Sequence, residues 1–333
     1  MGLRGWVTQP AGSWFTAVGA FPAAVKGEIV MPFLGEATAL ATVFCWTFSV
    51  QFFAAASRRV GVIPVNIIRL AVALVFFTLT LWIRDGSAVP LHFPPHAWWY
   101  LGLSGVVGFF IGDIFLFKAL VELGPRVAML IQSLAAPSAA LLGWLFLGET
   151  YVLRQWLGMA VALFGVALVI VERGGPRPPG KGSAPAITLL GVGSGLLGMG
   201  GQAVGTILSK TGMQVADGYL DAFAATEIRA MAAFACFAAY FTLTGKWRSV
   251  ASALNDGRAV LYTSCGALFG PFLGVSFSLL SLHYLSSGVA STFFALVPVC
   301  IIPFSVYLHK EYVSLRAVLG ACIAVGGVWM LSL

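Results

Sequence analysis

The chain has 333 residues, and its 19 basic and 12 acidic side chains make up only 9% of them, against about 25% in an ordinary soluble domain. Hydrophobic residues account for 59%, and the mean hydropathy is +0.93. This composition excludes a soluble globular protein, which needs more polar surface, and a disordered chain, which is polar and charged. Five cysteines in this length also exclude a disulfide-stapled secreted domain. The remaining class is a polytopic membrane protein.

The net charge of +7 does not indicate nucleic-acid binding, because the basic residues are scattered among short loops without a Lys/Arg run. The cysteines lie in apolar stretches without CxxC spacing, which predicts buried, unreactive thiols. No HExxH, P-loop, GxSxG or GxGxxG motif is present, and His92 and His96 alone are too few ligands for zinc. We therefore expect no enzymatic activity, no metal and no cofactor.

In chain order, residues 1–32 are predicted to form an N-terminal extension. Residues 14–25 are apolar but too short to cross a bilayer, and they lack the basic start of a signal peptide. The regular pattern begins near Met31, which is a candidate for the native start.

The rest of the chain contains ten apolar runs of about the 20 residues that a bilayer-crossing helix requires. They lie at 37–57, 61–83, 97–121, 126–147, 153–171, 187–209, 219–243, 259–284, 287–308 and 315–333. Their length and the absence of period-two alternation favour helices over barrel strands. Three longer joins, 84–96, 172–186 and 245–258, are predicted as loops.

The two halves of the chain are similar to each other. With a shift of 162 residues, 108–168 aligns with 270–330 without a gap, and 17 of the 61 positions are identical. The most specific identities are Glu149 with Glu311 and Arg154 with Arg316, which lie in a shared Glu-x-x-x-Leu-Arg-x-x-Leu-Gly pattern. Upstream, a shift of about 160 pairs Arg69 with Arg229. The sequence therefore contains an internal duplication.

Each repeat has five predicted helices, and an odd number forces the two repeats into opposite orientations in the membrane. The predicted fold is thus an all-α integral membrane protein, with ten transmembrane helices arranged as two inverted five-helix repeats. The first repeat covers 33–172, a linker covers 173–186, and the second repeat covers 187–333. Inverted repeats are typical of secondary transporters, which use them to build two equivalent gates around a central site.

The motifs in both halves resemble the EamA-type branch of the drug/metabolite transporter superfamily. The first half has GEATALATVFCW, an Arg in NIIRL, and GDIFLFKALVELGPRVAMLIQSLAAPSAALLGWLFLGE. The second has LHYLSSGVASTFFALVPVCIIPFSVYLHKE and RAVLGACIAVGGVWML. The resemblance implies two EamA repeats and transport of small metabolites by alternating access. One departure is that the sixth helix lacks the aromatic residue that Trp46 supplies in the first.

From this we predict a multi-pass inner-membrane transporter that exports a small organic metabolite, such as an amino acid or a drug-like solute. Its expected partners are that solute and membrane lipid, with protons as a candidate coupling ion and a second copy of the chain as a candidate partner. The alternatives are a flippase for lipid-linked sugars and a membrane scaffold without transport activity.

Charged side chains inside the predicted spans are the first candidates for function, because each is costly at membrane depth. Arg69 and Arg229 either brace the bundle or contact solute. Asp113 has the apolar Val275 as its repeat counterpart, so the duplication alone does not require it. It either pairs with Arg69 or holds a proton that exchanges during transport. Lys118 is expected to pair with Glu122, four residues on.

Polar and aromatic residues complete the candidate pathway. Gln51, Gln132 and Gln202 offer hydrogen bonds to a solute or between helices. Trp46 and Phe293 suit an aromatic or cationic solute, although membrane helices are generally rich in aromatics.

Two further pairs are predicted to shape the helices. Pro137 and Pro298 lie inside predicted helices and are expected to kink them. Glu149 and Glu311 are expected to cap the helices that follow them and to pair with Arg154 and Arg316.

Two arguments conflict on which side of the membrane the chain termini lie, and this orientation is left open. Sixteen basic residues lie in the segments between the spans or at the chain ends. If the N-terminus is cytoplasmic, eleven of them are on the extracytoplasmic side. The positive-inside rule therefore favours external termini, whereas the family resemblance implies cytoplasmic ones.

Overall fold

The computed structural model describes residues 33–123, 128, 131–172, 188–216, 218–301 and 315–332. The predicted extension 1–32, the candidate start Met31, the linker 173–186 and Glu311 lie outside these residues.

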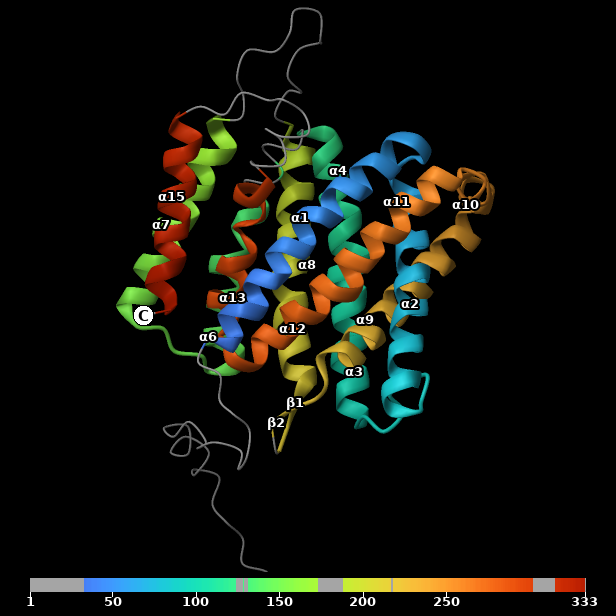
Figure 1. Ribbon diagram of the computed structural model, residues 1–333, viewed down its shortest axis with the longest axis horizontal. Coiled ribbons are helices and arrows are strands. Elements are labelled where there is room, and N and C mark those ends of the chain that lie inside the picture. Colours follow the sequence, from blue (N-terminus) through green and yellow to red (C-terminus); the bar gives the residue numbers. More distant parts are fainter. Residues whose placement is uncertain are drawn as a thin grey trace, which may run out of the picture. The chain divides into compact units, whose positions relative to one another are not determined.

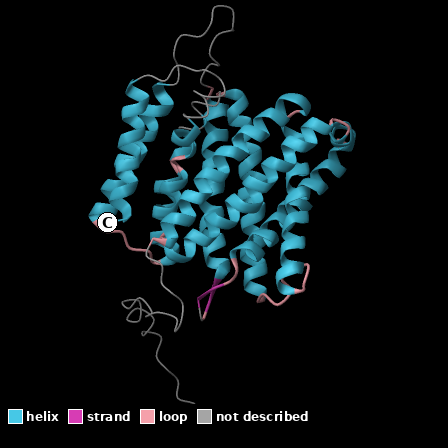
Figure 2. Ribbon diagram, viewed as in Figure 1, coloured by secondary structure: helices cyan, strands magenta, loops and turns pink. Residues whose placement is uncertain are grey.

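Helices occupy the described part of the first half (Figures 1 and 2). In chain order they are α1 (Leu34–Val60), α2 (Val62–Asp85), α3 (Pro95–Ser104), the π-helical η1 (Gly105–Gly112), α4 (Asp113–Glu122), α6 (Ala135–Leu147) and α7 (Leu153–Glu172). The segments α3, η1 and α4 follow one another without a break and form the third predicted helix.

The described part of the second half follows a similar order, with a small strand hairpin and a short helix added. Its elements are α8 (Leu189–Met213), β1 (Gln214–Val215), β2 (Gly218–Tyr219), α9 (Ala222–Thr244), α10 (Trp247–Leu254), α11 (Gly257–Ala267), the π-helical η2 (Leu268–Gly274), α12 (Val275–Tyr284), α13 (Ser287–Phe294) and α15 (Leu315–Ser332). The strands β1 and β2 form a small antiparallel hairpin, which the all-helical prediction did not include. The predicted loop 245–258 was also wrong in part, because it contains α10.

Five described helices are long and apolar enough to cross a membrane. They are Leu34–Val60, Val62–Asp85, Pro95–Leu116, Ala222–Thr244 and Gly257–Tyr284. Shorter apolar helices cover Ile131–Leu147, Leu153–Leu168, Ser287–Ile301 and Val318–Leu331. The structure is therefore that of an all-α membrane protein, and the count of ten spans stays a prediction.

Helix ends follow from local capping. The side chains of Thr188, Asp221 and Asp256 accept hydrogen bonds from the first backbone N–H groups of α8, α9 and α11. Gly148 ends α6 with a φ of 66°, a left-handed conformation that favours glycine.

Two irregularities recur at equivalent places in the halves. The π-helical segments end at Gly112 and Gly274, which the 162-residue shift pairs. Helix geometry also breaks at Leu134 and at its counterpart Leu296. Each break comes shortly before a proline, Pro137 in the first turn of α6 and Pro298 in the helical stretch 297–301.

The main core is built from equivalent residues of both halves. Phe77 on α2 and Phe237 on α9, separated by the 160-residue shift, are both buried in it, and so are Ile68 and Ile228. The two helices pack on each other, so the halves share one core.

The packing of the first helix of each half is also duplicated. The helix α8 packs on η1 and α4, while α1 packs on η2 and α12. Gly191 on α8 lies against Leu123, and Gly35 on α1 lies against Leu285, the counterpart of Leu123. A shift of 156 residues therefore relates α1 to α8.

The last helices of the halves, α7 and α15, lie side by side (Figure 1). Gly165 approaches the backbone of Ala324, and its counterpart Gly327 approaches the backbone of Ala162, the counterpart of Ala324. The residue number rises along one helix as it falls along the other, so these equivalent helices run antiparallel.

Candidate functional site

Asp113 is the centre of a buried charged cluster at the end of η1. It is the first residue of α4, directly after η1, and α8 packs on both of these helices. Asp113 is 7% exposed. Arg69 on α2 donates from Nη2 to Asp113 Oδ2 and forms an ion pair with it. Gln202 on α8 donates to Asp113 Oδ1 over 3.2 Å and to the Gly108 carbonyl over 3.3 Å. Both carboxylate oxygens therefore accept hydrogen bonds, which offsets much of the cost of burial.

Arg229 on α9 lies beside this cluster without a direct bond to Asp113. Its guanidinium carbon is 4.6 Å from the centre of the Phe109 ring, a cation–π geometry. The residue is 5% exposed, and Asp113 is close enough to act on it electrostatically. The cluster thus contains two guanidinium groups and one carboxylate.

Glycines allow the backbones to approach closely around this cluster. A Cβ on Gly201 of α8 would lie 2.9 Å from Gly112 Cα, and one on Gly198 would lie 2.9 Å from Leu116 N. Gly105 of η1 meets the backbone of α9 in the same way. We define the glycine seam as the α8–η1 contact formed by Gly108, Gly112, Gly198, Gly201 and Gly205. The seam brings Gln202 within reach of Asp113.

The equivalent place in the other half is apolar. Trp46 of α1 is the counterpart of Gln202, and its indole lies against Gly274 of η2, the counterpart of Gly112. Trp46 also packs edge-to-face on Phe294, with ring centres 5.3 Å apart. Val275 stands where the first half has Asp113, and it belongs to the hydrophobic core.

A serine–glycine hydrogen bond occurs in both halves, but the serine and the glycine have changed places. Ser104 of α3 donates to the carbonyl of Gly205 on α8, over 2.7 Å. Their counterparts are Gly266 and Ser49, and there Ser49 of α1 donates to the carbonyl of Gly266 over 3.0 Å. The hydrogen bond is kept with donor and acceptor swapped.

The remaining predicted site residues lie apart from the charged cluster. Lys118 pairs with Glu122 over 3.9 Å, as expected, and is exposed. Phe293 is buried among apolar side chains of a second core. Gln51 and Gln132 are half-buried, and within the described residues neither hydrogen-bonds to the cluster. The structure therefore gathers Asp113, Arg69, Gln202 and Arg229 and leaves the other candidates outside.

The expectation for Glu149 was wrong. It neither caps α7 nor pairs with Arg154. Instead it pairs with Lys210 at the end of α8 over 2.8 Å and accepts hydrogen bonds from the backbone N–H and the hydroxyl of Ser287, at the start of α13. The reason is the turn at Gly148, which directs the chain away from α6 before α7 begins.

Tyr151 and Lys210 complete this second cluster. The Tyr151 hydroxyl donates to Glu149 over 2.5 Å, and Lys210 also donates to the Leu285 carbonyl over 2.7 Å. Burial by itself would raise the pKa of Glu149, but Lys210, Tyr151 and Ser287 together hold that pKa below its ordinary value. Lys210 is 6% exposed. No sequence signal links it to Glu149, 61 residues away.

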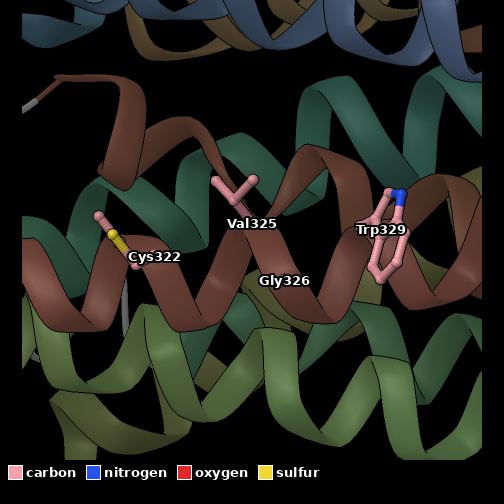
Figure 3. Close-up of a pocket in the computed structure, with 5 residues that line it drawn as sticks. Cys322, Val325, Gly326 and Trp329 are labelled. Carbon is pink, nitrogen blue, oxygen red and sulfur yellow. The ribbon is translucent and has the colours of Figure 1, made fainter.

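A shallow apolar groove runs along α15 (Figure 3). It is lined by Ala321, Cys322, Val325, Gly326 and Trp329. None of these side chains is charged, and an apolar helix face is the expected surface toward lipid.

Comparison with known proteins agrees with this architecture. The model of the EamA-like transporter family matches residues 33–171 and again residues 189–333. One solved crystal structure, whose title names no function, is 17% identical, with a TM-score of 0.65 over 89% of this chain and 95% of the other. At this identity it shows the fold alone. No curated protein matches the chain.

Because the family model covers most of the chain in two copies, the protein belongs to the EamA-like transporter family. It is accordingly a multi-pass membrane protein and a transporter of the drug/metabolite transporter superfamily.

Proposed function

We propose that the protein is a secondary transporter that exports a small organic metabolite by alternating access, with ten spans in two inverted repeats. The antiparallel contact of the equivalent helices α7 and α15 supports the inverted arrangement. The family membership supports transport, and the direction of export rests on the resemblance alone.

The observation that carries the proposal is the pair of equivalent contacts around the two π-helical segments. The same backbone geometry is used twice, by α8 on η1 and by α1 on η2. A two-fold arrangement of this kind supplies two related interfaces, of which one opens as the other closes. One contact contains Gln202 and Asp113, and the other contains Trp46 and Val275. We assign solute binding to the region between them, with Asp113, Arg69, Gln202 and Arg229 as its polar side.

The test is solute exchange by the purified protein in proteoliposomes. Vesicles loaded with a metabolite extract are diluted into labelled extract, with and without a proton gradient, and exchanged solutes are identified by mass spectrometry. We expect one class of small solutes to exchange across protein-containing vesicles and not across protein-free ones. Exchange of no solute under either condition would contradict the transporter assignment.

A further inference from the structure

The charged cluster has an excess of positive charge. Arg69 and Arg229 occupy equivalent positions in the two repeats, yet Asp113 is the carboxylate that the described residues place against them. A buried charge without a counter-ion is strongly destabilising. The second arginine therefore requires a reason that bundle architecture does not supply.

The two arginines differ in how their charge is stabilised. Arg69 forms the direct ion pair with Asp113. Arg229 has the face of Phe109 and the more distant Asp113. Among the described residues the Nε atoms of both arginines have no hydrogen-bond partner, so the difference between them is the direct ion pair, which Arg229 does not form. The stabilisation from a cation–π contact is smaller than the cost of burying the guanidinium. Arg229 thus keeps unused hydrogen-bonding capacity in the membrane interior.

The duplication shows where a second internal counter-ion would stand. In the first half, Asp113 pairs with Arg69. In the second half, the position equivalent to Asp113 is Val275, and the position equivalent to Arg69 is Arg229. Val275 is buried in the apolar core, on a helix that packs against α9. At that position the chain has no group that can neutralise Arg229.

We infer that Arg229 binds an anionic group of the transported solute, a carboxylate or a phosphate. This inference rests on the proposed transport function and adds the chemical class of the solute. A guanidinium presents several N–H donors in one plane, which match the oxygens of either group. Asp113 stays paired with Arg69 and does not compete for the ligand.

The glycine seam provides a route by which the solute can reach Arg229. Gly108 separates Arg229 from α8: a Cβ on Gly108 would lie 3.4 Å from Arg229 Nη2 and 3.8 Å from the Gly201 carbonyl. Because the seam is backbone against backbone, few side chains have to repack when α8 moves away from η1. Opening the seam exposes Arg229 and frees the amide of Gln202 as a second donor. The present structure is then the closed state of this site.

The experiment measures both ligand-induced thermal stabilisation in detergent and exchange in proteoliposomes. The probes are succinate, leucine and glycerol 3-phosphate, which carry an anionic group, with glucose as a neutral probe and tetraphenylphosphonium as a cation. We expect at least one of the first three to stabilise and exchange with the wild type, and neither of the last two. The first three also separate a carboxylate from a phosphate.

Two pairs of variants test the assignment to Arg229. Arg229→Gln should lower the apparent affinity for the anionic probe about tenfold to a hundredfold, the effect of losing a charged hydrogen bond, and Arg229→Lys should lower it less. Val275→Asp adds the missing counter-ion and should also weaken binding, whereas Val275→Asn should not. Arg248→Gln removes an exposed positive charge on α10 and should change nothing.

The outcomes separate this inference from the proposed function. Exchange of glucose or tetraphenylphosphonium alone, or anion exchange unaffected by both Arg229→Gln and Val275→Asp, would overturn the anion site and leave transport intact. Exchange of no solute, here and with the whole metabolite extract, would overturn both. If Arg229→Gln does not fold, as judged by gel filtration, the contrast between Val275→Asp and Val275→Asn decides.

Discussion

At the scale of single residues, two buried carboxylates are held by specific side chains of other helices. Asp113 accepts bonds from Arg69 and Gln202, and Glu227 accepts one from Thr78 over 3.1 Å. Each contact joins helices from different parts of the chain. Removing one member therefore leaves the other without its partner inside the bundle, where no water replaces it.

Asp113→Asn tests whether this carboxylate is an ion-pair partner or a proton carrier. If Asp113 is the ion-pair partner of Arg69, its replacement removes that buried pair and should lower the free energy of unfolding by about 3–5 kcal/mol. Thermal unfolding in detergent measures this, and Arg69→Gln in the same background should restore part of the loss. A stable Asp113→Asn protein that keeps exchange but no longer responds to a proton gradient would instead support proton coupling.

At the scale of elements, the helices meet through two kinds of joint. The glycine seam between α8 and η1 is a backbone contact, while α8 is attached to the α6–α7 turn and to α13 through the cluster of Lys210, Glu149 and Ser287. The first joint has few side chains to separate, and the second is made of strong charged bonds. Each is therefore sensitive to a different substitution.

Gly201→Ala should damage the seam, because the added methyl group would lie 2.9 Å from Gly112 Cα and from the Val107 carbonyl. The backbones have to separate, and overpacking of this kind costs about 1–3 kcal/mol. Gly200→Ala is the matched control, since nothing lies within 4 Å of its Cβ, and it should be neutral or slightly stabilising. Thermal unfolding of both variants measures the difference, and equal stability would show that the seam is not tightly packed.

Glu149→Gln should lower the free energy of unfolding at neutral pH by about 3 kcal/mol or more, because Lys210 then stays buried without its counter-ion. The pKa of Glu149 is lowered in the folded state. Its contribution is therefore complete above the ordinary glutamate pKa of about 4.3 and is lost as the pH falls through the folded value. Thermal unfolding measured between about pH 3 and about pH 8 should show the stabilities of the wild type and the variant converging in acid.

The control for this prediction is Asp256→Asn. Asp256 pairs with Arg59 at the exposed surface over 2.8 Å, so its effect should be smaller and should disappear in high salt. A Glu149→Gln effect that is equally sensitive to salt would mean that the cluster is open to solvent.

At the scale of the whole molecule, the two halves build one structure from equivalent parts. They share a core through Phe77 and Phe237, and they meet at α7 and α15. Antiparallel packing of these equivalent helices places their first residues at opposite ends of the contact. We therefore expect these first residues to lie on opposite sides of the membrane.

Cysteine labelling of the equivalent positions Arg154 and Arg316 tests this arrangement. Both residues are exposed at the start of their helices. In a background in which the five native cysteines are replaced, Arg154→Cys and Arg316→Cys should react with a membrane-impermeant maleimide from opposite sides of the membrane. Labelling from the same side would rule out the inverted repeats, and the side on which each reacts also decides the orientation of the termini.

The membrane class, the positions of most described helices and the duplication could be predicted from the sequence. These properties depend on composition and on local order along the chain, such as runs of apolar residues and the matched Glu149 and Arg154. The pairing of Lys118 with Glu122 was accessible for the same reason, since four residues along a helix bring side chains together.

Contacts between distant segments were decided by the tertiary structure. Glu149 pairs with Lys210 and not with the nearby Arg154, because the left-handed turn at Gly148 directs it toward α8 and α13. In the same way, Gln202 meets Asp113 only because glycines on both sides let α8 approach η1. The sequence by itself determined which groups are buried and must find partners, and the three-dimensional packing determined which partners those are, because that choice depends on distances between helices that no local pattern encodes.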